Sequence, residues 1–140
     1  MTDDCIFCQI VAGKIPCARV YEDDHALAFL DISPLAEGHT LVIPKRHAPD
    51  LFSIAPAEMA ALAPVLSKVG RAICQAVVAP ALNLLAANGK EAGQIVFHVH
   101  FHLIPRRAGD GLGFRWQSRG RQPAAALSDV AQRIADCLPG

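Results

Sequence analysis

Residues 94–104 read Gln-Ile-Val-Phe-His-Val-His-Phe-His-Leu-Ile, and this stretch decides how the whole chain is interpreted. Its odd-numbered positions are all apolar, whereas its even-numbered positions include His98, His100 and His102. Because successive side chains of a β-strand point to opposite faces, this period of two predicts a strand over 94–104. The three imidazoles would share one face, about 6.6 Å apart along the strand, and Pro105 would end it.

The segments around this strand predict an α+β fold. Short apolar runs with β-branched and aromatic residues predict four further strands, at 18–22, 26–32, 40–44 and 82–87. Apolar residues spaced three and four apart predict a long helix over 56–78, which Pro64 should kink or split, and a second helix over about 124–138. The pair Asn88-Gly89 favours a sharp reversal and a hairpin with the histidine strand. We expect a mostly antiparallel five-stranded sheet with helices on one face.

The composition indicates a single globular domain spanning residues 1–140. Thirteen basic residues balance thirteen acidic ones, so the formal net charge is zero, which disfavours a general nucleic-acid binder. Hydrophobic residues make up 52% of the chain, enough to build a core, yet no apolar run reaches the roughly 18 residues of a membrane span. The acidic N-terminus does not resemble an export signal, and five cysteines suggest no disulfide framework. We therefore expect a cytoplasmic protein without a membrane association.

The three histidines on one strand face indicate chemistry, because folding alone does not require them there. Two interpretations compete. Alternate histidines on a strand can ligate one zinc ion, or one neutral imidazole can attack phosphorus while its neighbour handles protons. No Asp or Glu lies on the strand to complete a hydrolytic metal cluster, so nucleophilic catalysis is the favoured interpretation.

The segment His-Val-His-Phe-His-Leu-Ile at 98–104 resembles the signature of the histidine triad (HIT) family. Further blocks resemble the family at Cys5-Ile6-Phe7-Cys8, at 29–34, at 38–47 and from Asn88-Gly89 to Gly93-Gln94. The resemblance covers about residues 4–107, and a C-terminal arm of about 108–140 matches less closely. It implies a HIT-like fold with one long helix and a C-terminal helix, assembled as a homodimer.

The resemblance also implies an activity, since family members are nucleotide hydrolases and transferases that act at the α-phosphate. His100 matches the histidine that attacks phosphorus and forms a nucleotidyl-histidine. His102 matches the residue that contacts the phosphate and delivers a proton to the leaving group. A glutamine stands there in the transferase branch, so His102 favours hydrolysis. His39 matches an additional relay histidine, expected near the first histidine of the triad.

Nucleotide contacts are implied in the same way. Asp31 matches the carboxylate that binds the ribose hydroxyls, and Gly93 would let the backbone approach the phosphate closely. Ile95 stands where a serine often contacts the phosphate in the phosphoramidase-like branch, which leaves the leaving group open between an amine and a second nucleotide. The remaining expected contacts are an apolar slot for a purine base and two polar groups near the phosphate: Ile6, Phe7, Phe29, Leu30 and Ile32, and Asn88 and Gln94.

A second expected site is a zinc site. The spacing of Cys5 and Cys8 suits two sulfur ligands on one tetrahedral ion, although a redox pair has the same spacing. The resemblance adds His47 and His98 as the other two ligands of a structural zinc site. An arginine-rich tail follows the histidine strand (Arg106, Arg107, Arg115, Arg119 and Arg121). Such a cluster can hold phosphates or RNA, but a solvated loop is the commoner outcome and is expected here. Trp116 is a candidate for substrate stacking or dimer packing.

The expected function is therefore hydrolysis of purine nucleoside 5′-phosphoryl derivatives, either phosphoramidates or dinucleoside polyphosphates. Two alternatives stay open. The chain could be a non-catalytic nucleotide sensor or scaffold, or a hydrolase that uses the histidine row as a catalytic zinc site.

Overall fold

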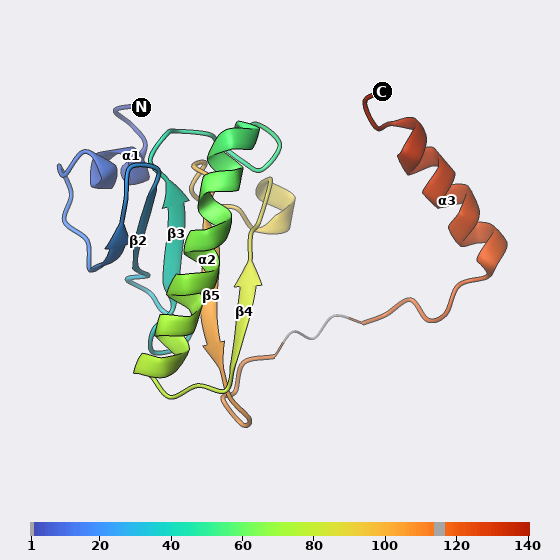
Figure 1. Ribbon diagram of the computed structural model, residues 1–140. Coiled ribbons are helices and arrows are strands. Elements are labelled where there is room, and N and C mark those ends of the chain that lie inside the picture. Colours follow the sequence, from blue (N-terminus) through green and yellow to red (C-terminus); the bar gives the residue numbers. More distant parts are fainter. Residues whose placement is uncertain (1, 114–116) are drawn as a thin grey trace. The chain divides into compact units, whose positions relative to one another are not determined.

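A computed structural model describes residues 2–113 and 117–140, which form two compact units, residues 1–110 and residues 111–140 (Figure 1). Arg115 and Trp116 lie outside the described residues. The first unit contains a five-stranded antiparallel sheet in the order β1-β2-β3-β5-β4. Its strands are β1 (Arg19–Glu22), β2 (Ala26–Leu30), β3 (Thr40–Pro44), β4 (Ala81–Leu85) and β5 (Phe101–Arg106). The predicted α+β class and antiparallel five-stranded sheet are confirmed.

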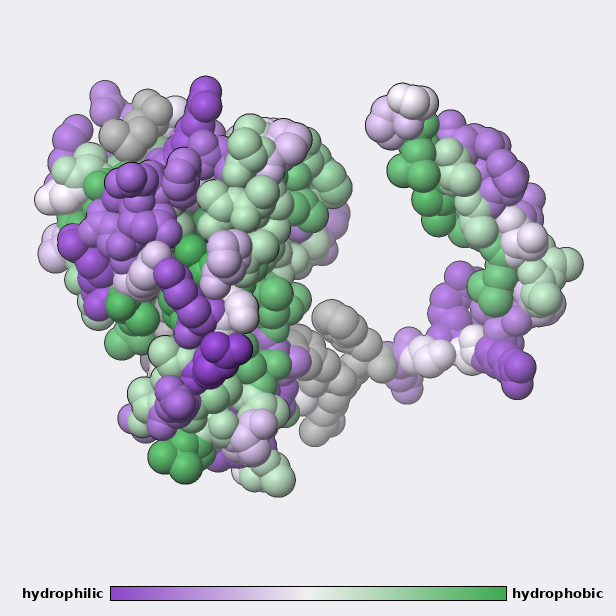
Figure 2. Space-filling view, viewed as in Figure 1, coloured by the Kyte–Doolittle hydropathy of each residue, from purple (hydrophilic) through white to green (hydrophobic). Residues whose placement is uncertain are grey.

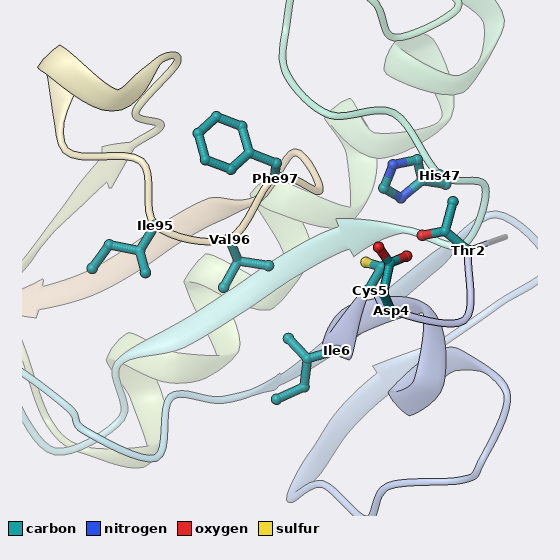
Figure 3. A pocket seen from close by; sticks show the side chains of 8 residues that line it. All are labelled: Thr2, Asp4, Cys5, Ile6, His47, Ile95, Val96 and Phe97. Carbon is teal, nitrogen blue, oxygen red and sulfur yellow. The ribbon is translucent and has the colours of Figure 1, made fainter.

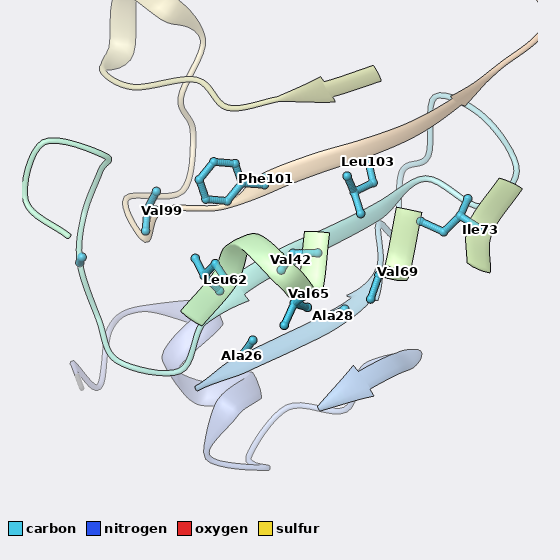
Figure 4. Close-up of a cluster of buried hydrophobic side chains, with 11 residues drawn as sticks. Ala26, Ala28, Val42, Leu62, Val65, Val69, Ile73, Val99, Phe101 and Leu103 are labelled. Atoms are coloured by element: carbon cyan, nitrogen blue, oxygen red, sulfur yellow. The ribbon is translucent and has the colours of Figure 1, made fainter. Parts of the chain in front are cut away.

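The long helix α2 (Pro56–Ala76) crosses one face of the sheet (Figure 1). Its buried side chains recur at helical spacing and pack on the small residues of β2 and the apolar residues of β5 (Figure 4). Each such buried Leu or Val contributes about 1.5–3 kcal/mol relative to exposure. The helix is not split at Pro64. Proline has no N–H to donate to the carbonyl of Ala60, but both residues are exposed, so water can hydrogen-bond to that carbonyl.

A short helix, α1 (Ile6–Val11), covers the opposite face of the sheet and was not predicted. Phe7 packs there against alternate residues of β2 and β3, the set Leu27, Phe29, Leu41 and Ile43. Both faces of these two strands are therefore covered, which explains why they are buried along most of their length. This smaller core is the floor on which the candidate site is built.

The histidine strand is shorter than predicted, because β5 begins only at Phe101. The alternation holds at Val99 and beyond, but Ile95 is 88% exposed and Phe97 is 49% exposed. The partner strand β3 ends at Pro44, which has no backbone N–H, so the ladder cannot continue toward residue 94. Val99 donates its N–H to the carbonyl of Ala48 instead.

The predicted pairing of the fourth strand with the histidine strand is confirmed, but the connection is not a tight hairpin. Residues 86–100 form a long loop that contains a 3-10 turn, η1 (Lys90–Ala92). Gly89 and Gly93, on either side of this turn, both have positive φ angles, of 92° and 95°, which glycine adopts without strain.

The second unit contains helix α3 (Ala124–Asp136), close to the predicted range. Its apolar residues Leu127, Val130 and Ile134 are exposed and form a hydrophobic stripe along one side of the helix (Figure 2). None of the helices in the described part of the chain is long and apolar enough to cross a membrane.

Candidate functional site

His39 and His102 lie side by side because β3 and β5 are paired. Leu41 is opposite His102 in the register, and His39 directly precedes β3. His39 is 2% exposed, and its Nε2 lies 2.9 Å from Nδ1 of His102. His39 was expected near the first histidine of the triad, His98. That expectation is wrong, since its neighbour is the third.

A backbone group fixes the proton positions in this pair. The N–H of Leu35 donates to Nδ1 of His39 at 3.1 Å. A neutral imidazole has one donor and one acceptor nitrogen, so Nε2 of His39 carries the proton and donates to Nδ1 of His102. His102 therefore carries its own proton on Nε2, the nitrogen that is free to act as a donor.

The electrostatics agree with this neutral arrangement. Burial, helped by repulsion from His100 and His39, lowers the pKa of His102 to about 4, against the opposing effect of Asp31. Burial also lowers the pKa of His39, and Asp31 again acts in the opposite direction. Both rings are thus uncharged near pH 7.

His100 has the opposite tautomer. Its Nδ1–H donates to the carbonyl of His98 at 2.7 Å, which leaves Nε2 with an unshared electron pair. None of the described residues hydrogen-bonds to that Nε2. The ring of Phe7 meets the His100 ring edge-to-face at 5.2 Å, and the His102 ring lies 5.0 Å away. These contacts hold a potential nucleophile next to a potential proton donor.

His100 and His102 line a cavity of about 450 Å³ beneath α1. Asp31 lies in its wall, with Oδ1 accepting the N–H of Ser33 at 2.8 Å and Oδ2 at 3.6 Å from Nε2 of His39. Nine of the sequence-predicted residues line the cavity, namely Ile6, Phe7, Phe29, Leu30, Asp31, Ile32, Gly93, His100 and His102. The remaining lining residues are Ile10, Ser33, Leu41, Ile95 and Val96, of which only Ile95 had been placed near the phosphate.

Two predicted nucleotide contacts are not among the lining residues. Gln94 is buried, and its amide accepts the N–H of Gly89 and donates to the carbonyls of Pro49 and Val96. Asn88 Oδ1 accepts the N–H of Leu51 at 2.8 Å. Both side chains thus stabilise the loop that carries one wall of the cavity.

A second cluster brings together Cys5, Cys8, His47 and His98. Cys5 caps the N-terminus of α1, because its Sγ accepts the N–H of Cys8 at 3.3 Å. His98 is completely buried and donates its Nε2–H to the carbonyl of Pro44 at 2.8 Å. Its Nδ1 therefore has a free electron pair directed at the other three residues. Burial lowers the pKa of His98 to about 4, which keeps the ring neutral.

The separations within this cluster match a tetrahedral metal site. The two Nδ1 atoms are 3.2 Å apart, and the sulfur–nitrogen distances are 3.4 Å for Cys5 to His98, 3.4 Å for Cys8 to His47 and 3.5 Å for Cys8 to His98. Tetrahedral zinc with ordinary bond lengths requires about 3.3–3.4 Å between nitrogens and about 3.5–3.6 Å between sulfur and nitrogen. The four residues fit a metal ion.

The second grouping of metal-ligand residue types among the described residues, Asp31, His39 and His102, does not fit a metal ion. The N–H of Leu35 occupies Nδ1 of His39, so Nε2 carries a proton and cannot ligate. The 2.9 Å contact in this grouping is a hydrogen bond between two rings. The grouping is therefore a chain of proton donors and acceptors.

Sequence reasoning missed Leu35, Ile10 and Leu41. Ile10 lies one helical turn after Ile6 and therefore on the same face of α1. Leu41 lies two residues after His39 and therefore on the same face of the extended chain. These two spacings could have identified both residues. Leu35 acts through its backbone amide, for which the sequence carries no signal.

Comparison with known proteins supports a family assignment. The HIT domain family profile matches residues 12–109. The chain is 48% identical over 138 residues to Protein hit of Bacillus subtilis, covering 97% of this chain and 95% of that protein. It is 40% identical over 139 residues to adenylylsulfatase HINT3 of Arabidopsis thaliana, covering 99% and 69%. It is 46% identical over 115 residues to adenosine 5′-monophosphoramidase hnt1 of Schizosaccharomyces pombe, covering 81% and 84%.

Solved structures give the same result. A HIT family member from Bacillus subtilis matches with a TM-score of 0.94 and 42% identity, covering 99% of both chains. A zinc-bound histidine triad family protein from Mycobacterium smegmatis matches with a TM-score of 0.75 and 42% identity, covering 95% of this chain and 96% of that one.

Proposed function

The chain belongs to the histidine triad (HIT) family, and on that premise we propose that it hydrolyses purine nucleoside 5′-phosphoryl derivatives at the α-phosphate. The observation that supports this most strongly is the hydrogen bond from Nδ1 of His100 to the carbonyl of His98. It leaves the Nε2 electron pair of His100 available within a cavity of nucleotide size. His100 is therefore the proposed nucleophile, and the reaction passes through a nucleotidyl-histidine.

His102 and His39 handle the proton in this proposal. The negative α-phosphate, bound beside His102, favours the protonated ring and draws in one proton, with Asp31 acting in the same direction on both rings. The added proton occupies Nδ1 of His102, so in this state Nε2–H of His39 donates instead to Oδ2 of Asp31, which lies 3.6 Å away in the free protein. As the phosphorus bond to the leaving nitrogen or oxygen breaks, that atom takes the proton. Water then attacks phosphorus, which releases the nucleotide, free His100 and one proton.

In this proposal the nucleotide occupies the cavity. The purine lies between the apolar side chains of α1 and β2, where Phe7 and Phe29 meet edge-to-face at 5.6 Å. Asp31 accepts hydrogen bonds from the ribose hydroxyls through Oδ2. Gly93 has no side chain and so leaves room for the phosphate. We assign Asn88 a contact to the phosphate through its amide nitrogen, and Gln94 the positioning of the loop.

The leaving group is an amine or a second nucleotide. One relative is named a monophosphoramidase, which implies nitrogen on the adenylyl phosphorus. Another is named an adenylylsulfatase, which implies sulfate on the same phosphorus. Both names are consistent with attack at an adenylyl phosphate.

The cluster of Cys5, Cys8, His47 and His98 holds a structural zinc ion in this proposal. Burial raises the pKa of the Cys5 thiol, so a cation is needed to favour the thiolate. When bound, zinc would tie the start of α1 to the histidine segment, and α1 carries the walls of the cavity. Reduced cysteines are required, which suits the cytoplasm.

We also propose that the protein is a homodimer joined beside β4. β4 is an outer strand of the sheet, and Leu84 is 54% exposed. An apolar groove of about 620 Å³ lies between α2 and β4, where Leu66 and Leu82 form part of its wall. A second copy would cover this groove and the strand edge together.

The test is a quenched reaction with adenosine 5′-phosphoramidate, followed by mass spectrometry. We expect an adenylyl adduct on the peptide that contains His100, and no adduct or turnover in His100→Ala. His25→Ala is the matched control, because His25 is exposed and outside the cavity. Normal turnover in His100→Ala would refute the nucleophile. Tight nucleotide binding without turnover would make the protein a sensor, and prompt loss of activity on chelation with the fold intact would indicate a catalytic metal.

A further inference from the structure

A second cavity, of about 420 Å³, lies between the N-terminal segment and residues 95–97 (Figure 3). Ile6, Ile95 and Val96 line both this cavity and the nucleotide cavity. The two cavities therefore adjoin across a shared wall. His100 lines only the nucleotide cavity, so a leaving group that extends across this wall from an α-phosphate beside His100 would enter the second cavity.

The charge of the second cavity comes from Asp4. Cys5 and His47 line this cavity and also belong to the metal cluster. With a divalent cation bound, two thiolates and two neutral imidazoles give that cluster a net charge of zero. Asp4 is then the only described lining residue that carries a formal charge. Asp4 has no ion pair among the residues that the structure describes. The neighbouring Asp3 differs, since its carboxylate lies 3.7 Å from Nζ of Lys14.

The part of the wall that residues 95–97 form is apolar, whereas Thr2, Cys5 and His47 place polar groups on the other side. Ile95 and Phe97 extend from the loop with 88% and 49% of their surfaces exposed, and Figure 3 shows both side chains beside the cavity. Exposed apolar side chains that border a cavity suit a hydrocarbon chain, and an aromatic face also attracts a cation. A polyphosphate would meet the Asp4 carboxylate and no basic side chain in the described lining.

From these observations we propose that the second cavity receives the leaving group, and that Asp4 makes the protein selective for amines that carry a positively charged end on a hydrocarbon chain. The inference rests on the proposed phosphoramidate hydrolysis and names its substrate class. The bond that breaks is the phosphorus–nitrogen bond, and the amine departs with the proton supplied through His102, as in the reaction above.

The test compares three adenosine 5′-phosphoramidates of similar length, made from 1,5-diaminopentane, n-hexylamine and 5-aminopentanoate. We expect kcat/KM to be about three- to fivefold higher for the cationic substrate than for the neutral one, and lowest for the anionic one, as for an exposed ion pair. The differences should shrink in 1 M salt. Asp4→Asn should remove the preference, whereas Asp3→Asn, which changes the net charge equally, should keep it.

The outcomes separate this inference from the proposed function. Failure to hydrolyse simple adenosine 5′-phosphoramidate, and dinucleoside polyphosphates as well, refutes the proposed function itself, whereas failure on the phosphoramidate alone refutes the amine leaving group on which this inference rests. Hydrolysis of all three substrates at equal kcat/KM by the unmodified protein, with no effect of salt, overturns only the role of Asp4. The same loss of preference in Asp3→Asn and Asp4→Asn also overturns it, because general surface charge would then account for the selectivity.

Discussion

Two pairs of histidines in this molecule look alike at short range but are suited to different chemistry. His47 and His98 approach to 3.2 Å, and His39 and His102 approach to 2.9 Å. The two pairs differ in the backbone group that contacts the outer ring nitrogen of one member, His98 in the first pair and His39 in the second. His98 donates its Nε2–H to the carbonyl of Pro44, which leaves the electron pair of its Nδ1 directed inward. His39 faces the N–H of Leu35, which occupies its electron pair and leaves a proton directed inward.

This contrast teaches that the backbone partner of the outer nitrogen decides whether a histidine can ligate a metal or must donate a proton. Residue type and proximity do not distinguish the two pairs. The neutral states of His98, His39 and His102 are all favoured by burial, and all three rings carry their proton on Nε2. The two pairs therefore differ in which nitrogen faces the neighbouring histidine, Nδ1 in His98 and Nε2 in His39, and not in charge.

The largest expected effect is a loss of stability when the cluster that contains His47 and His98 is disrupted. Cys8→Ser should remove a metal ligand and lower the melting temperature by about 10 °C or more, because structural zinc contributes strongly to folding. Thermal unfolding by circular dichroism, with bound zinc measured on the same samples, checks this. Cys74→Ser is the matched control, since Cys74 lies outside the cluster and donates only to the carbonyl of Ala81. Equal melting temperatures for Cys8→Ser and Cys74→Ser would contradict a structural metal.

The next effect separates the pairs by activity. His102→Gln keeps an N–H donor but cannot carry a proton at neutral pH, so kcat should fall about 10²-fold. Zinc content and melting temperature should stay close to those of the unmodified protein, which assigns the loss to the proton-handling pair. A steady-state assay with adenosine 5′-phosphoramidate measures kcat, and an unchanged kcat would remove His102 from the reaction.

A smaller effect should appear in the pH dependence of stability. The folded-state pKa of His102 is about 4, below the ordinary value of about 6.5 that applies when the chain is unfolded. The unfolded chain therefore binds more protons between these values, and stability falls as the pH drops from about 6.5 toward 4. Urea unfolding measures the free energy of unfolding at pH 7 and at pH 5. The decrease between these two pH values should be about 1–2 kcal/mol smaller in His102→Gln than in the unmodified protein. Identical losses in both proteins would show that His102 is not buried in its neutral form.

Much of the fold could be predicted from the sequence, because the pattern of apolar residues determines which strands and helices are buried. The period of two correctly identified Val99, Phe101 and Leu103 as buried. It failed over residues 94–98 because alternation within one strand does not show where its partner ends, here at Pro44. Helix α1 was missed because it has only six residues, and these include both cavity-lining residues and Cys8 of the cysteine–histidine cluster, which leaves little periodic pattern.

The candidate site was predictable where side chains define it and not where the backbone does. Residues of the nucleotide cavity and of the cysteine–histidine cluster were identified through the family motifs, and the structure brings each set together. The polar groups of Gln94 were expected at the phosphate, but backbone partners satisfy them. The amide of Leu35 and the carbonyl of Pro44 have no counterpart in the residue sequence, although they fix the tautomers.

The most direct test of this account is nitrogen-15 NMR of the histidine rings in the zinc-loaded protein at neutral pH. The account predicts protons on Nε2 of His98, His39 and His102, with Nδ1 of His98 bound to metal, and a proton on Nδ1 of His100. A proton on Nδ1 of His39, or on Nε2 of His100 in the free protein, would contradict it, because the donor and the nucleophile would then be reversed.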